Sequence, residues 1–195
     1  MNDTSLGQQY FDRLYERDAD PWQFQTSDYE RDKYAATLAA LPRERYQTAI
    51  EIGCSISVLT QMLAPRCGEI LGLDISQAAI GSAQKRCANM PHVQFQVAQF
   101  PHVELQRTFD LILLSEVLYY FDAIDIVTVA DKVWEIAKPG ADIVCVHWLG
   151  PTPDYPMTGD QAMTAFEQAL GAPEAVYRTR EQNYRLDIFR LPPTG

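Results

Sequence analysis

Short apolar runs alternate with longer stretches of helical spacing along most of the chain. Short continuous runs rich in β-branched residues are typical of buried strands, and apolar residues three or four positions apart are typical of one helix face. The pattern predicts strands at 48–52, 70–74, 93–97, 109–114 and 142–148, and helices at about 57–65, 76–88, 123–137 and 158–170. Strands that alternate with helices predict an α/β fold with a parallel, doubly wound sheet.

The two ends of the chain depart from this alternation. Helical spacing at 6–17 and 28–41 precedes the first strand, with Ser27 as the N-cap of the second helix. Two strand-like runs, 174–181 and 184–191, end the chain, and the two residues between them force an antiparallel hairpin. We therefore predict a Rossmann-like sheet that is mostly parallel and ends in an antiparallel pair.

The N-terminal residues 1–40 contain more aromatic side chains than a free tail would, including Tyr10, Phe11, Trp22 and Tyr29. They are expected to form a helical lid over the carboxyl edge of the sheet. A Rossmann-like core would follow at 48–195. Lid and core would form a single domain, 1–195, because 195 residues with 47% apolar content are enough for one hydrophobic core and leave little for a second domain.

Composition and net charge narrow the classes of substrate and partner that the chain is expected to bind. The formal charge of −10 and a pI near 4.7 give no general attraction to nucleic acid or to anionic lipid, so a small-molecule substrate is favoured. The four cysteines lack C-x-x-C spacing, no metal-ligand spacing is visible, and no leader or long apolar stretch stands out. These features favour a cytoplasmic protein without nucleic-acid, membrane or metal partners, and leave its oligomeric state open.

The segment 48–60 reads as strand, tight turn and helix, and the next strand ends at Asp74. An acidic residue about 20 positions after the glycine turn of such a unit accepts hydrogen bonds from ribose hydroxyls, which predicts a nucleoside cofactor. The dinucleotide fingerprint fails, because Ser55 and Val58 stand where it needs glycine. The acidic-x-G start of the methyltransferase loop matches at Glu51 and Gly53.

The chain resembles the class I S-adenosylmethionine-dependent methyltransferases, and among them the nodulation protein S-like group, over nearly its whole length. The segments that carry the resemblance are Asp20–Trp22, Ser27–Lys33, Glu51–Ser55, His147–Trp148 and, most specifically, Phe109–Tyr120.

The resemblance implies S-adenosylmethionine as the cofactor and assigns its site by position. The methionine part is assigned to Glu51, Gly53, Cys54 and Ser55, and the ribose to Asp74 and Ile75. The adenine is assigned to Ala98, Gln99 and Phe100, and the side of the sulfonium to Ser115 and Glu116. Two departures are visible: serines at 55 and 57 replace loop glycines, and Gln99 replaces a common acid, although its amide oxygen can accept the same hydrogen bond.

The loops after the fourth and fifth strands supply the candidate catalytic residues Glu116, Tyr119 and His147, with Asp154 as a further candidate base. Trp22, Tyr119 and Trp148 offer aromatic faces to a cation. Structural explanations stay open, since Glu116 can be a helix N-terminal carboxylate and His147 a satisfied core histidine.

The leading hypothesis is a methyltransferase acting on a small-molecule amine, such as an aminosugar or oligosaccharide, as the resemblance implies. O-methylation of a small metabolite is the second hypothesis. A non-catalytic relative that binds S-adenosylmethionine is the third, motivated by the two loop serines.

Overall fold

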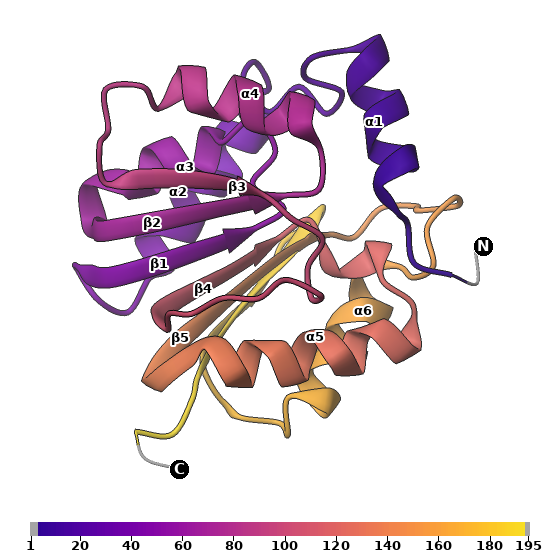
Figure 1. Cartoon of the computed structure of the whole chain (residues 1–195). Helices are drawn as coiled ribbons and strands as arrows, with labels where there is room; N and C mark the ends of the chain where they lie inside the picture. The colour runs from indigo at the N-terminus through magenta and orange to yellow at the C-terminus, as the bar shows by residue number, and fades with distance from the viewer. Residues whose placement is uncertain (1–3, 194–195) are drawn as a thin grey trace.

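A seven-stranded sheet forms the centre of the molecule (Figure 1). The computed structural model describes residues 4–193, so residues 1–3 of the expected lid and 194–195 of the core lie outside it. The strands are β1 (Tyr46–Ile52), β2 (Cys67–Asp74), β3 (Val93–Val97), β4 (Phe109–Ser115), β5 (Ala137–Trp148), β6 (Glu174–Arg180) and β7 (Tyr184–Arg190). Their order across the sheet is β3-β2-β1-β4-β5-β7-β6.

The pairing confirms the predicted sheet. The first five strands are parallel to their neighbours, and β7 pairs antiparallel with both β5 and β6. The strand order reverses between β1 and β4, and ligands of open α/β sheets bind outside the carboxyl ends of the strands at such a point.

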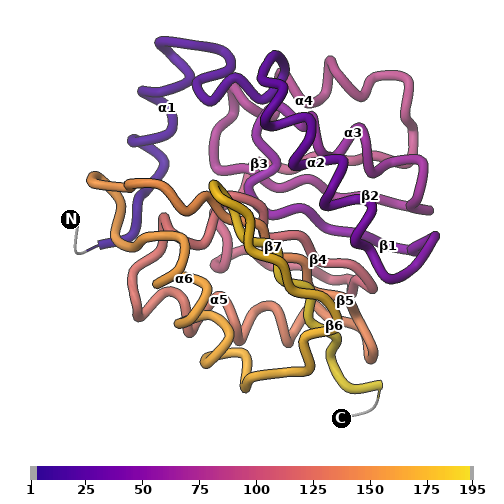
Figure 2. Tube along the Cα trace, turned by 180° about the vertical axis from the view of Figure 1, so that it is seen from behind, coloured from indigo at the N-terminus to yellow at the C-terminus, as the bar shows by residue number. Residues whose placement is uncertain are grey.

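Helices cover both faces of the sheet, so most residues of β1 and β4 are buried. They are α1 (Gln8–Arg17), α2 (Asp28–Ala40), α3 (Val58–Leu63), α4 (Gln77–Arg86), α5 (Ala123–Ile136) and α6 (Gly159–Ala169), with 3₁₀ turns η1 (Ala64–Arg66) and η2 (Leu118–Tyr120). Helices α5 and α6 lie on one face, while α2 and α3 lie on the other, as the view from behind shows (Figure 2).

Alternation of side chains along each strand divides the core into two layers. Ile112 and Leu114 of β4 pack toward α5 and α6, whereas Leu111 and Leu113 pack with Tyr34 of α2. The predicted elements agree with the observed ones to within a few residues. The turn η2 was not predicted, because three residues do not establish a helical period.

The N-terminal segment divides into two parts. Helix α1 stands beside the carboxyl ends of the strands, and the Leu6 amide before it donates to the Tyr120 carbonyl at 2.8 Å (Figure 1). Helix α2 begins at Ser27, whose side chain accepts from the Glu30 amide as the sequence predicts, and it packs on the sheet face. The expected position over the carboxyl edge therefore fits α1 and the following loop but not the body of α2.

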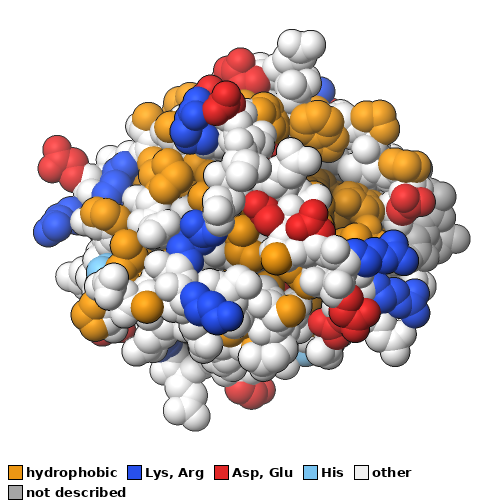
Figure 3. All heavy atoms as spheres, turned by 90° about the horizontal axis from the view of Figure 1, so that it is seen from above, with side chains coloured by type: hydrophobic (Ala, Val, Ile, Leu, Met, Phe, Trp, Pro, Cys, Tyr) orange, Lys and Arg blue, Asp and Glu red, His pale blue; other side chains and the backbone are white. Residues whose placement is uncertain are grey.

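The surface carries interspersed acidic and basic side chains, with apolar groups between them on the face above α1 and α4 (Figure 3). All four cysteines are free thiols, and only Cys67 is not fully buried. Within residues 4–193, no helix has the length and apolar character needed to cross a bilayer.

Candidate active site

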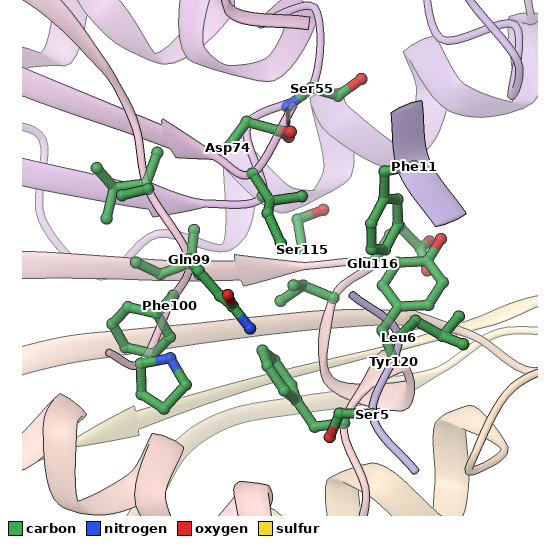
Figure 4. Close-up of a pocket in the computed structure, with 18 of the residues that line it drawn as sticks. Ser5, Leu6, Phe11, Ser55, Asp74, Gln99, Phe100, Ser115, Glu116 and Tyr120 are labelled. Atoms are coloured by element: carbon green, nitrogen blue, oxygen red, sulfur yellow. Dashed lines mark hydrogen bonds between the residues drawn. The ribbon is translucent and has the colours of Figure 1, made fainter. Parts of the chain in front are cut away.

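A cavity opens at the carboxyl ends of β1 to β4, beneath α1 (Figure 4). Its lining includes Trp22 and nine of the eleven residues that the resemblance implies for the cofactor: Gly53, Ser55, Asp74, Ile75, Ala98, Gln99, Phe100, Ser115 and Glu116. The other two, Glu51 and Cys54, lie behind the loop. We call this space the cofactor cavity.

Asp74 is held at the end of β2 by backbone donors. Its carboxylate accepts from the Ser55 amide at 2.9 Å and from the Ser76 amide at 2.8 Å. Burial raises the pKa of Asp74 to about 6, although these backbone hydrogen bonds lower it. The carboxylate lines the cavity, and oxygen lone pairs remain for donors from a ligand.

The loop serines adopt a left-handed backbone conformation, which glycine adopts without strain. Ser55 has φ 49° and Ser57 has φ 62°, both in the left-handed region, and Gly53 has φ 72°. Ser57 is fully buried and lines none of the site cavities. Left-handed non-glycine residues cost of order 1–3 kcal/mol each and cluster at functional sites, so the serines preserve the loop shape without filling the cavity.

Glu51 and Cys54 lie behind this loop. They line a small neighbouring cavity with Gly53, Ser55 and Ser115. Thr60 donates a short hydrogen bond to Glu51, but burial dominates and raises the pKa of Glu51 to about 8. Burial also raises the pKa of the Cys54 thiol well above its usual value, which fits a packing role rather than a nucleophilic one.

The far end of the cofactor cavity is built by the segment after β3. The side chain of Gln99 points into the cavity, and Phe100 lies beside it (Figure 4). The Ala98 amide donates to the Asp74 carbonyl at 2.9 Å, which ties this segment to the end of β2. A planar amide beside an aromatic ring suits a purine, since it offers both a donor and an acceptor at the edge of a stacking surface.

Glu116 joins the cofactor cavity to a second, aromatic cavity, which we call the acceptor cavity. The acceptor cavity is lined by Trp22, Phe24, Ser27, Tyr29, Glu30, Glu116, Tyr119, Tyr120, Trp148, Pro151, Thr152 and Tyr155. Glu116 lies directly after β4 with φ 55°, again in the left-handed region, so its carboxyl group is set by the backbone at the boundary of the two spaces.

The Glu116 carboxylate is fully engaged. Oε1 lies 2.5 Å from Lys33 Nζ, while Oε2 accepts from the Tyr119 hydroxyl at 2.7 Å and from the Trp148 amide at 2.8 Å. Burial by itself would raise the pKa of Glu116, but Lys33 and the hydrogen bonds lower it below its usual value. This is the geometry of a fixed anion rather than of a free base.

Tyr119 lines the acceptor cavity as predicted, whereas His147 does not. His147 is 0% exposed, and its Nε2 accepts from the Leu118 amide at 3.1 Å. Burial lowers the pKa of His147 to about 4, so the ring is neutral near pH 7. His147 supports η2 and the Tyr119 ring, with centroids 5.5 Å apart, in place of the acid-base role expected of it. Asp154 is exposed outside both cavities.

Sequence reasoning missed Lys33, Glu30 and Tyr15. Tyr15 of α1 shares a 2.5 Å hydrogen bond with Ser55, and Lys33 reaches both Glu30 and Glu116. A signal for Lys33 exists, because the buried positions of α2 are 30, 33, 34 and 37, the spacing of one helix face. Glu30 and Lys33 are charged residues on this buried face, and buried charges need partners. The sequence does not show that Glu116 is the second partner of Lys33.

Comparison with known proteins places this geometry in a family. The family model for nodulation protein S (NodS) matches residues 8–143. The chain belongs to the NodS family. Family membership confirms the resemblance to the NodS group of S-adenosylmethionine-dependent methyltransferases, and with it the Rossmann-like fold.

Individual NodS relatives agree with this assignment. The nodulation protein S of Bradyrhizobium diazoefficiens is 28% identical over 139 residues, covering 66% of each chain. That of Sinorhizobium fredii is 31% identical over 104 residues, covering 53% of this chain and 48% of its own. The chain thus matches about half to two thirds of the length of these curated relatives.

A solved NodS structure matches over more of the chain. The crystal structure of the N-methyltransferase NodS from Bradyrhizobium japonicum WM9 in complex with S-adenosyl-L-homocysteine has a TM-score of 0.83 and 26% identity. The match covers 94% of this chain and 97% of that one.

Proposed function

We propose that this protein is an S-adenosylmethionine-dependent methyltransferase that transfers a methyl group to the nitrogen of a small-molecule amine. The observation that carries the proposal is the Glu116 carboxyl group, paired with Lys33, at the boundary between the cofactor cavity and an aromatic cavity. The relative solved with S-adenosyl-L-homocysteine, an N-methyltransferase, supports the cofactor and the class of reaction.

The residues around the cofactor cavity fit S-adenosylmethionine. Asp74 would accept from the ribose hydroxyls, Gln99 and Phe100 would hold the adenine, and Gly53 and Ser55 would face the methionine part. The cofactor supplies a methyl group on a sulfonium, which is already a good leaving group. The protein's task is therefore to align the acceptor and to exclude water.

The acceptor cavity suits a protonated amine on entry. Glu116 and Glu30 bring negative charge, and Tyr29, Tyr119 and Trp148 bring aromatic faces. The amine must lose a proton before its nitrogen attacks, and among the described residues neither the neutral, buried His147 nor Glu116 with its lowered pKa is a good proton acceptor. Glu30 lines the same cavity and burial raises its pKa, so Glu30 or water at the mouth of the cavity takes the proton, and turnover should rise with pH.

The test combines binding with a substrate screen. Calorimetric titration with S-adenosyl-L-homocysteine should give a dissociation constant in the micromolar range or better, and NAD should give no heat. Mass spectrometry of a panel of primary amines, glucosamine included, incubated with S-adenosylmethionine should show a gain of one methyl group. Turnover on hydroxyl or carboxyl acceptors alone would establish O-methylation instead. Binding without turnover on any acceptor would favour the non-catalytic relative, and absence of binding would contradict the proposed cofactor.

A further inference from the structure

Lys33 is one of the most buried large side chains in the molecule, at 2% exposure. It lies on the inner face of α2, next to Tyr34 and Thr37. A buried ammonium is costly unless it is paired with anions and hydrogen-bonded, and a methionine or leucine would fill the same volume without that cost. The position therefore requires a reason beyond packing.

Lys33 connects two elements that are far apart in the sequence. Its Nζ lies 2.8 Å from Glu30 on its own helix and 2.5 Å from Glu116 at the end of β4, and the second pair is separated by 83 residues. Nζ also lies 5.2 Å from the centre of the Tyr29 ring. Lys33 thus reaches from the face of the sheet to the boundary between the cofactor cavity and the acceptor cavity.

The surroundings of Glu116 contain no other cation among the side chains described here. The facing groups are Lys33, Glu30, Tyr29 and Tyr34 from α2, Tyr119 from η2, and His147 with the Trp148 amide from β5. The pKa of each of these three tyrosines is raised and that of His147 is lowered, so all four are neutral near pH 7. Burial also raises the pKa of Glu30, although Lys33 lowers it. Lys33 is thus the one ammonium that Glu116 and Glu30 share at the wall of the acceptor cavity, among the side chains described here.

We propose that Lys33 is a positioning residue that keeps the Glu116 carboxylate ionised and fixed, so that Glu116 serves as a permanent counter-charge for the acceptor and not as its proton acceptor. This inference rests on the proposed methyl transfer to an amine. It differs from a role in folding alone, in which Lys33 would only fasten α2 to the sheet.

Removal of the ammonium gives the distinguishing experiment. In Lys33→Met, Glu30 and Glu116 would lie close together without a cation, and like charges at that spacing share a proton. We compare wild type, Lys33→Met, Lys33→Arg and Lys132→Met. Lys132 is the matched control, because it forms an ion pair with Glu135 at the same i,i+3 spacing on α5, outside both cavities.

Two readouts are measured on each protein. The ¹³C carboxyl signal of Glu116, assigned by its loss in Glu116→Gln, is titrated in the complex with S-adenosyl-L-homocysteine. The pH profiles of kcat and KM are recorded with the amine that turns over best in the panel. The dissociation constant of S-adenosyl-L-homocysteine is measured alongside, because absent binding would contradict the proposed function itself rather than the role of Lys33.

The wild-type Glu116 signal should remain that of a carboxylate down to about pH 5. In Lys33→Met its midpoint should rise by more than about one pH unit, and kcat should fall roughly 10-fold or more near neutral pH and recover as pH rises. Lys33→Arg should restore the midpoint and recover most of the lost turnover. Lys132→Met should match wild type.

Three results would overturn the inference. The first is a wild-type Glu116 that protonates above about pH 6, and this measurement decides the matter even if Lys33→Met does not fold. The second is an unchanged Glu116 titration in Lys33→Met. The third is a loss of turnover by the same factor at every pH, which is the signature of a purely structural lysine.

Discussion

The site has a cofactor half, built around the cofactor cavity, and an acceptor half, built around the acceptor cavity. The two halves hold their carboxyl groups in different ways. Asp74 is fixed by the backbone amides of Ser55 and Ser76, which lie in its own βαβ unit. Glu116 is fixed mainly by side chains, Lys33 and Tyr119, with one amide from β5. Backbone donors are independent of side-chain identity, so the first arrangement follows from the fold, whereas the second depends on particular residues.

This difference has an electrostatic consequence. Asp74 has no cationic partner among the described residues, and burial raises its pKa to about 6. Glu116 is equally enclosed, yet its ion pair with Lys33 lowers its pKa. The buried Asp74 carboxyl can thus be stabilised by the donors of a ligand, whereas the Glu116 carboxyl already has a cationic partner before any ligand arrives.

Asp74→Ala should produce the largest effect. The variant loses the carboxylate that we propose accepts from the ribose hydroxyls, and it also frees the Ser55 amide. Hydrogen bonds to a charged group contribute about 1.5–3 kcal/mol each, so the dissociation constant of S-adenosyl-L-homocysteine should rise roughly 10³-fold. Calorimetry measures this, and circular dichroism should show an intact fold. A change below about tenfold would remove Asp74 from the cofactor site.

Glu116→Gln should affect turnover more than cofactor binding. The amide removes the negative charge at the boundary of the two cavities, while Lys33 keeps Glu30 as a partner. We expect kcat on amines to fall roughly 10²-fold with the dissociation constant of S-adenosyl-L-homocysteine changed by less than about threefold. Full turnover in the variant, measured by product formation under saturating cofactor, would contradict the role of Glu116 and the proposed N-methylation.

The two halves also differ in how much of them the sequence revealed. The strand-turn-helix-strand pattern predicted Asp74 and Gly53 because that unit is local, and the polar contacts within it span about 20 residues or fewer. The role of Lys33 was not predicted, since its contact with Glu116 spans 83 residues and depends on how α2 packs. His147 was misassigned for a related reason: strand position places it near the site, but only packing shows that its ring points into the core.

Glu51 supplies a test by pH, because it is buried in the cofactor half without a cation. Burial raises its pKa in the folded protein to about 8, from an unfolded value of about 4.3. Between these values the folded state binds more protons than the unfolded state, so stability falls as pH rises. Asp74, with its pKa raised to about 6, contributes in the same direction at lower pH.

Glu51 makes the largest contribution between pH 6 and 8: Asp74 adds to it near pH 6, and His147, whose pKa is lowered to about 4, opposes it where the unfolded imidazole still titrates. Without ligand, the free energy of unfolding should fall by roughly 2–3 kcal/mol across this window, and the melting temperature by several degrees. Glu51→Gln should flatten the slope, because its amide does not titrate and can still accept from Thr60. An identical slope in this variant would show that Glu51 is ionised in the folded protein near neutral pH.

Tyr15→Phe should produce the smallest effect and tests whether α1 belongs to the cofactor half. The change removes only the hydroxyl that bonds to Ser55 at 2.5 Å, and the ring keeps its edge contact with Trp22 at 5.8 Å. A hydrogen bond of this kind contributes about 0.5–1.5 kcal/mol, so affinity for S-adenosyl-L-homocysteine should fall about two- to tenfold. Tyr10→Phe is the matched control, since Tyr10 lies on the same helix outside the cofactor cavity and contacts Tyr155 instead.

Limited proteolysis tests whether α1 acts as a lid. If α1 closes on the cofactor, ligand should protect the segment before α2 in wild type and in Tyr10→Phe, and should protect it less in Tyr15→Phe. Equal cleavage of wild type with and without ligand would identify α1 as a static packing helix, and would limit the cofactor half to the loops of the sheet.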